Sequence, residues 1–108
     1  MSKKSVRPRE QARQDTDTAV DYYLRETGLD IALGFIDALE TTYCTIADHP
    51  GVGSPRYSHE LDIPGLRNHP LKRYPYLVFY VEREDHIDVW RVLHAERDIP
   101  ALMRTGEH

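Results

Sequence analysis

The sequence predicts a small α+β domain in which an N-terminal antiparallel helical hairpin packs on a small C-terminal antiparallel β-sheet. Apolar residues recur at helical spacing over 9–27 and again over 32–46, on either side of a short link at 28–30. Two stretches rich in β-branched and aromatic residues, 76–81 and 87–94, follow near the C-terminus. A chain of 108 residues has room for one modest core. We therefore expect a single domain over 1–108, loosely ordered at 1–8 and 100–108.

The first helix is predicted over 9–27. Pro8 suits a first helical turn, because a proline has no N–H group to leave unpaired there. Gly28 suits the position just past a helix end, where the chain often turns left-handed. The second helix follows at once and is predicted to end at His49 and Pro50. Two helices joined by so short a link must be antiparallel neighbours.

The stretch 49–70 is rich in proline and glycine and is predicted to be irregular. We expect an edge strand from Leu66, because Pro70 cannot donate a backbone hydrogen bond within a central strand. A hairpin then covers 76–94, with its turn at 82–86.

The last strand is predicted to have two mixed faces, because successive side chains of a strand point to opposite sides. Each face carries both apolar and polar residues, so the pattern leaves open which one covers the helices. Trp90 is expected to lie in the core, since a single tryptophan in mid-strand usually packs there. Strict alternation places on one side Ile87, Val89, Arg91 and Leu93, and on the other Asp88, Trp90, Val92 and His94.

Charge is segregated along the chain, although the net charge is only −4. Five basic residues oppose one acid over 1–14, whereas eight acids oppose Arg25 alone over 15–48, a local balance of −7. The stretch 64–81 carries three basic residues and no acid. An acidic chain binds polyanions poorly, so we expect no specific nucleic-acid binding by this chain alone.

Several classes of protein do not fit the composition. No apolar run approaches the roughly 20 residues of a membrane helix, and the N-terminus lacks the apolar segment of a signal peptide. A single cysteine, Cys44, cannot form an internal disulfide or a cysteine-based zinc site. We expect a cytoplasmic protein without membrane contact.

The sequence carries no strong catalytic motif. Its six histidines lack the spacing of metal ligands, and there is no glycine-rich phosphate loop or nucleophile elbow. We therefore predict no catalytic residue, no metal and no cofactor, although His94 could act as a general acid or base.

Arg91 and His94 admit two interpretations. In the first, Arg91 pairs with an acid of the helices and His94 is a satisfied histidine at the edge of the core. In the second, both belong to a basic surface that contacts a target. The target-contact candidates are Lys72, Arg73, Arg91, His94 and Arg97.

Five stretches carry a resemblance to a known family. The similarity runs over about 15–99, and the closing Arg-Val-Leu-His-x-x-Arg-Asp pattern is its most specific part. The stretches are Ala32-Leu-Gly-Phe-Ile-Asp37, Ile46-Ala-Asp-His-Pro50 with Gly53, Gly65-Leu-Arg67, Tyr76-Leu-Val-Phe-Tyr80 and Val89-Trp-Arg-Val-Leu-His-Ala-Glu-Arg-Asp98. Through them the chain resembles the ParE toxins of bacterial type II toxin–antitoxin modules, within the RelE/ParE superfamily.

The resemblance implies a toxin that inhibits DNA gyrase by binding, a role in plasmid stabilization, and a ParD-like antitoxin partner. It also implies a first strand near Ser5–Arg7, where the sequence lacks the apolar alternation of a buried strand. The related RelE branch cleaves mRNA on the ribosome with basic residues and a late Tyr or His. Aligned by the last strand, its catalytic arginine falls near Ala95 and its late tyrosine near Ala101. These alanines favour the ParE branch, with a RelE-like ribonuclease or a non-toxic binding module as the alternatives.

The acidic helices suggest where an antitoxin would bind. We expect it to bring cationic residues to the hairpin, which would tune the rate and specificity of association. The alternative is that the acids only solvate two helices. The antitoxin-contact candidates are Phe35, Asp37, Glu40 and Tyr43.

Overall fold

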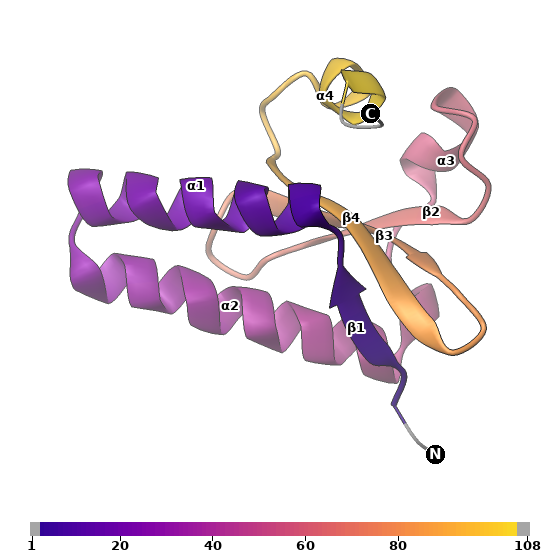
Figure 1. Ribbon diagram of the computed structural model, residues 1–108, viewed down its shortest axis with the longest axis horizontal. Coiled ribbons are helices and arrows are strands. Elements are labelled where there is room, and N and C mark those ends of the chain that lie inside the picture. The colour runs from indigo at the N-terminus through magenta and orange to yellow at the C-terminus, as the bar shows by residue number, and fades with distance from the viewer. Residues whose placement is uncertain (1–2, 106–108) are drawn as a thin grey trace.

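Two long helices lie side by side on one face of a four-stranded sheet (Figure 1). This computed structural model describes residues 3–105. The antiparallel helical hairpin and the C-terminal β-hairpin are as predicted, and the fold class is confirmed. The elements in chain order are β1 (Ser5–Pro8), α1 (Glu10–Glu26), α2 (Leu29–Asp48), η1 (Pro50–Val52), α3 (Arg56–Glu60), β2 (Leu66–Pro70), β3 (Tyr76–Glu82), β4 (His86–His94) and α4 (Ile99–Thr105).

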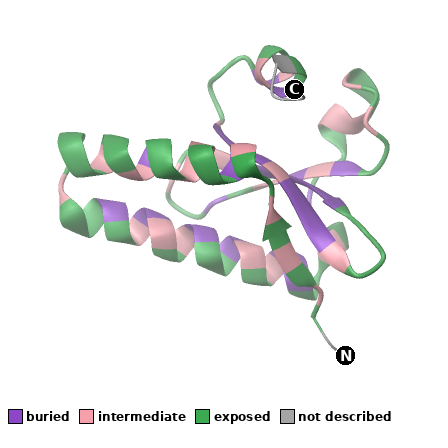
Figure 2. Cartoon of the chain, viewed as in Figure 1, coloured by how far each residue is buried: buried purple, intermediate pink, exposed green. Residues whose placement is uncertain are grey.

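The helical hairpin reverses at Gly28. Its φ of 112° is a conformation that only glycine adopts without strain. Along α1, the buried residues are Ala12 and Ala19. Their small side chains let the helix approach its neighbours closely. On α2 the larger Phe35 and Ile46 fill the space above the sheet. Figure 2 shows buried, intermediate and exposed positions following one another every few residues along both helices.

The sheet has the order β1-β4-β3-β2, so β4 and β3 are central and β2 is an edge strand as predicted. A β-bulge interrupts β4. Phe79 pairs with Arg91, but the next residue, Tyr80, pairs with Val89, which leaves Trp90 as the extra residue. The bulge shifts the alternation by one position, so the strictly alternating faces expected for this strand are wrong.

The two faces of β4 sort by polarity once the bulge is taken into account. Ile87, Val89 and Val92 pack in the core beneath α1 and α2. Leu93 packs with Trp90 in a second cluster on the opposite face. Trp90 is only partly buried, so its expected place in the main core is also wrong.

β1 confirms the first strand that the family resemblance implies near Ser5–Arg7. Ser5–Pro8 pairs with β4 in parallel, so the sheet is mixed rather than purely antiparallel. An edge strand buries little, and here Val6 alone packs on the main core while its neighbours stay exposed. The backbone pairing therefore forms without the apolar alternation of a buried strand. Residues 1–2 lie outside the described part of the chain.

Two short helices, α3 and α4, partly cover the second face of the sheet. The stretch 49–70 was expected to be irregular, but it contains η1 and α3. At the C-terminal end, 99–105 forms α4. Ile99 and Met103 of α4 pack against Phe79 and Leu93 of the sheet. The fold therefore has partial cover on both sides of the sheet, where the sequence suggested only two layers. Residues 106–108, also expected to be loose, lie outside the described range.

A buried tyrosine fastens the η1 segment to the sheet. The hydroxyl of Tyr80 donates to the Pro50 carbonyl at 2.7 Å and accepts the Gly53 N–H at 3.0 Å. Arg67 also donates to the Gly53 carbonyl, at 2.7 Å. The backbones of Ser54 and Asn68 then exchange two hydrogen bonds. These contacts leave no room for a side chain at position 53.

Gly53→Ala should lower the free energy of unfolding by about 1–3 kcal/mol, because overpacking forces a tight site to shift. A Cβ atom there would lie 2.6 Å from the Tyr80 hydroxyl and 2.9 Å from the Asn68 carbonyl oxygen. Gly51→Ala is the matched control, since a Cβ atom at Gly51 meets nothing within 4 Å. Urea denaturation measures both variants, and equal stabilities would contradict the packing described here.

Candidate functional site

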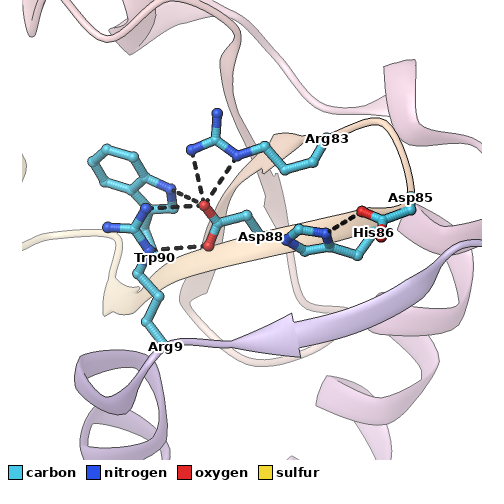
Figure 3. Close-up of polar contacts among 6 residues, drawn as sticks. All are labelled: Arg9, Arg83, Asp85, His86, Asp88 and Trp90. Atoms are coloured by element: carbon cyan, nitrogen blue, oxygen red, sulfur yellow. Dashed lines mark hydrogen bonds and ion pairs between the residues drawn. The ribbon is translucent and has the colours of Figure 1, made fainter.

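Asp88 is a buried carboxylate held by cations on the second face of the sheet (Figure 3). Arg9 donates from Nε to Oδ1 at 3.0 Å and from Nη2 to Oδ2 at 2.9 Å. Arg83 donates twice to Oδ2, at 3.2 and 2.9 Å. Trp90 adds its indole N–H at 3.1 Å, and its ring lies 4.0 Å beneath the Arg9 guanidinium. The sequence analysis missed this cluster, because its members come from three separate segments.

The pKa of Asp88 lies below the usual range of an aspartate. Burial is the largest single influence and raises the pKa, but the hydrogen bonds from Arg9, Arg83 and Trp90 and the charge of Arg9 together outweigh it. Arg9 and Arg83 thus form ion pairs within the chain. Next to them, exposed Asp85 accepts from His86 at 2.7 Å, and this hydrogen bond chiefly lowers the pKa of Asp85.

Arg91 is buried and paired with Asp15 of α1. Its Nε and Nη2 donate to the two carboxylate oxygens at 2.8 and 2.9 Å, and its Nη1 donates to the Leu102 carbonyl of α4 at 2.9 Å. The hydrogen bonds to Asp15 are the main cause of a raised Arg91 pKa. Asp15 also accepts the Val92 N–H at 3.0 Å. The ion-pair interpretation is confirmed, and Arg91 does not lie at an exposed rim.

His94 lies at the edge of a hollow of about 600 Å³ between α1 and the end of β4. Its ring packs edge-on against Tyr76, with centroids 5.2 Å apart, and its Nδ1 accepts the Glu96 N–H at 3.1 Å. These contacts fit a satisfied histidine at the edge of the core. Arg97 is exposed and lines the same hollow, together with Thr18 of α1.

Lys72 and Arg73 lie in the loop between β2 and β3, and both are exposed. Lys72 lines a different hollow, beside Thr41 and Thr45 of α2. Of the five target-contact candidates, the structure brings Arg91, His94 and Arg97 to the walls of one hollow, where Arg91 is paired with Asp15, and places Lys72 elsewhere. A single basic surface made of all five does not form.

The second face of the sheet carries a hollow of about 650 Å³ that the sequence analysis also missed. It lies between the α3–β2 segment, β4 and α4. Its lining is mainly apolar, and three charged side chains are also part of it. The lining residues are Leu61, Asp62, Ile63, Pro64, Arg83, Trp90, Met103 and Arg104.

The antitoxin-contact candidates are placed differently from one another. Asp37 and Glu40 are exposed on α2. Phe35 is fully buried among Tyr23, Tyr74 and Tyr76, so its expected contact with a partner is wrong. The spacing of apolar residues in the sequence shows which side of a helix is buried, but not which residue of that side is buried most deeply. In α2 that residue is Phe35.

Tyr43 lies half-buried between the two helices. Burial, and next the charge of Asp15, raise its pKa to about 12, while Arg13 partly offsets them. Tyr43 is therefore a neutral hydrogen-bonding and apolar group at physiological pH, and part of it remains available to a partner.

The positions that would carry nuclease chemistry present only methyl groups. Ala95 and Ala101 are both exposed, and the Ala95 N–H donates to the Pro75 carbonyl at 2.8 Å. Within residues 3–105 there is no group of three or more histidine, cysteine or acidic side chains placed to hold a metal ion. The helices of this range also include none that is long and apolar enough to cross a membrane.

The structure is thus an acidic helical hairpin on a small mixed sheet, whose last strand ends at a hollow lined by His94 and Arg97. The family model described as "ParE toxin of type II toxin-antitoxin system, parDE" matches residues 6–99, and the chain belongs to this family. As such it is the toxin of a type II toxin–antitoxin pair and has an antitoxin as its partner.

The fold is shared with a solved structure described as "Chromosomal ParDE TA system from P. aeruginosa". The TM-score is 0.72 at 22% sequence identity, and the match covers 86% of this chain and 97% of that chain. Identity at this level speaks for the fold alone. The sequence has no significant match among curated proteins.

Asp88→Asn should lower the free energy of unfolding by about 2 kcal/mol at pH 7, because a neutral amide replaces charge-assisted hydrogen bonds to partly exposed arginines. The folded pKa of Asp88 is depressed, so its contribution is present above the unfolded value of 3.8 and is lost as pH falls through the folded value. Denaturation from pH 7 to pH 2 should therefore show the gap between wild type and variant closing in acid. Asp21→Asn is the control, because Asp21 is exposed on α1, and a pH-independent gap for Asp88→Asn would contradict this account.

Arg91→Ala should cost about 3 kcal/mol of stability, because it leaves the Asp15 carboxylate buried without its partner. Arg97→Ala should change stability by less than about 0.5 kcal/mol, since this side chain is exposed. Thermal and urea unfolding distinguish the two. Similar losses at both positions would show that Arg97 also has a structural role.

Proposed function

We propose that this toxin inhibits DNA gyrase by binding and that a ParD-like antitoxin neutralises it. The observation that carries the proposal is the pair of alanines, Ala95 and Ala101, where a ribonuclease of the same superfamily needs an arginine and a tyrosine. A binding inhibitor needs no nucleophile or cofactor. Such a toxin would act in the cytoplasm, where gyrase works, and could stabilise a plasmid that encodes the pair.

The dispersal of cations supports inhibition by binding over cleavage of mRNA. A ribonuclease has to clamp a phosphate and position an acid–base pair. Here Arg91 is engaged with Asp15, and Lys72 lies in a different hollow from His94 and Arg97. Arg97, with His94 behind it, is the candidate left exposed for a target at the end of β4.

The proposal is tested with purified chain in two assays. Loss of gyrase supercoiling, with mRNA intact on translating ribosomes, is the expected result. Cleavage of mRNA on those ribosomes would overturn the proposal in favour of the RelE-like function. Harmless expression in the absence of antitoxin would instead identify a non-toxic binding module.

Arg97→Glu should weaken gyrase inhibition at least tenfold without changing the free energy of unfolding by more than about 0.5 kcal/mol, because it reverses an exposed charge at the proposed contact. Arg56→Glu is the matched control, since Arg56 is exposed on α3 on the other side of the sheet. Titration of each variant in a supercoiling assay measures the effect. If both variants inhibited gyrase equally, the end of β4 would not be part of the contact with gyrase.

A further inference from the structure

The hollow of about 600 Å³ beside His94 lies between α1 and the chain that leads from β4 to α4. A smaller hollow of about 170 Å³ adjoins it, and the two have part of their lining in common. In Figure 1 the chain between β4 and α4 lies on the side of α1 that faces away from α2. We call the two hollows together the tyrosine pocket. Most of its larger part is formed by Thr18, Tyr22, Tyr23, Tyr76, His94 and Arg97.

The aromatic walls of the tyrosine pocket are held in place by ring contacts. Tyr22 is 49% exposed and meets the ring of Tyr23 edge-on, with centroids 5.4 Å apart. Tyr23 in turn packs against the buried Phe35 at 5.6 Å. Tyr76 lies between Phe35 and His94, with its ring centroid 5.2 Å from each. The walls are therefore largely ordered in the free chain, so little conformational entropy remains to be lost when a partner binds there.

Three hydroxyls of the tyrosine pocket have no partner within the described part of the protein. In the range 3–105, the side chains of Thr18, Tyr23 and Tyr76 form no hydrogen bond. Every buried side-chain nitrogen or oxygen in that range is hydrogen-bonded, so the hydroxyls of Tyr23 and Tyr76 reach solvent. Burial is the main cause of a raised pKa at both tyrosines. Both therefore stay protonated at physiological pH and can donate to a ligand.

Two nitrogen groups add to these donors. His94 accepts the Glu96 N–H at Nδ1, 3.1 Å away, so the proton of its neutral ring lies on Nε2. Arg97 forms no ion pair with any residue of 3–105. Burial and the charge of Tyr22 raise the pKa of Tyr76, while the charge of Arg97 lowers it, which agrees with a guanidinium close to that hydroxyl. The polar groups of the tyrosine pocket are therefore mainly unused donors.

A carboxylate is the ligand that fits these donors best. Hydroxyl, imidazole and guanidinium groups all donate to the oxygens of carboxylates and phosphates. The surrounding charge favours the carboxylate, because Glu96 also lines the larger hollow, Asp98 follows Arg97 directly, and the chain carries a net charge of −4. A strand of phosphates would be repelled there, whereas one carboxylate needs only one cation. Tyrosine and arginine are also the residues that most often dominate protein–protein contacts.

We propose that the tyrosine pocket binds one aspartate or glutamate side chain of the toxin's target protein, an inference that rests on the proposed function for the identity of that protein as gyrase. The carboxylate accepts hydrogen bonds from Arg97, from Nε2 of His94 and from the Tyr76 hydroxyl. Its methylene groups pack on the exposed ring of Tyr22. Arg91 takes no part, because it is paired with Asp15.

Two variants test the pocket, both by titration in a supercoiling assay and by growth arrest in cells without antitoxin. Tyr76→Phe removes one hydroxyl and should weaken both effects about tenfold, the cost of one hydrogen bond to a charged group. Tyr22→Ala removes the exposed ring and should weaken them about tenfold as well. Tyr57→Phe is the matched control, since this tyrosine lies in α3 and packs on the second face of the sheet. All three variants should keep the urea midpoint of the wild type.

Carboxyl labelling identifies the group that the pocket binds. Gyrase is treated with a carbodiimide and glycinamide, alone and with the toxin, and the modified aspartates and glutamates are located by mass spectrometry. Wild-type toxin should protect one acidic residue of gyrase, and Tyr76→Phe at the same concentration should protect it less. Replacing that acid by its amide and combining it with Arg97→Gln should give a loss of binding smaller than the product of the two single losses, because both changes break the same contact.

The alternative outcomes are distinct. Unchanged inhibition by both Tyr76→Phe and Tyr22→Ala, or a product of independent losses in the combined variant, overturns the proposal while the inhibition of gyrase stands. Binding that requires gyrase-bound DNA and falls steeply with salt would assign the pocket to a phosphate and also overturns it. A chain that arrests growth without affecting gyrase refutes the proposed function. Weaker arrest by Tyr76→Phe and Tyr22→Ala would then still support the pocket, and unchanged arrest would refute it too.

Discussion

The ion pair between Asp15 and Arg91 joins three parts of the fold at one buried point. Asp15 belongs to α1, Arg91 to the central strand β4, and the Leu102 carbonyl that Arg91 also binds belongs to α4. The carboxylate further holds the Val92 N–H beside the bulge. Because both partners are largely buried, either one alone would be a costly unpaired charge. This ion pair therefore helps to hold α1, and with it the helical hairpin, in place on the sheet.

The bulge at Trp90 makes this geometry possible. It moves Val92 onto the helix face and Leu93 onto the opposite face, so that both cores receive apolar side chains from one strand. Trp90 itself turns to the second face, where its indole N–H helps to hold Asp88.

The sequence predicted the elements with strong periodicity and missed those that depend on distant partners. Helices α1 and α2 and the β3–β4 hairpin follow from local pattern, since each buries a continuous apolar stripe or face. β1 was expected only through the family resemblance, near Ser5–Arg7, because its stability comes from pairing with β4 rather than from the pattern of its own side chains. The bulge, too, is a property of two paired strands.

The candidate residues divide along the same line. Asp37, Glu40 and Arg97 are exposed as expected, because a charged residue outside an apolar stripe usually meets solvent. Arg91 and Phe35 are buried, and only the packed arrangement shows it. In the Asp88 cluster, Arg9 and Arg83 bind the same carboxylate although they are far apart in the sequence. Local residue spacing cannot predict such a contact.

The pairing of β1 with β4 also sets an order of events during synthesis. Ser5 has no strand partner until His86 has been made, so the sheet cannot close until nearly the whole chain is available. Before then the helical hairpin can form, but its apolar side has nothing to cover it. Contacts of such long sequence separation slow folding, and a chain cut short before β4 would lack the central strand entirely. Only a fully synthesised chain can present a completed toxin surface.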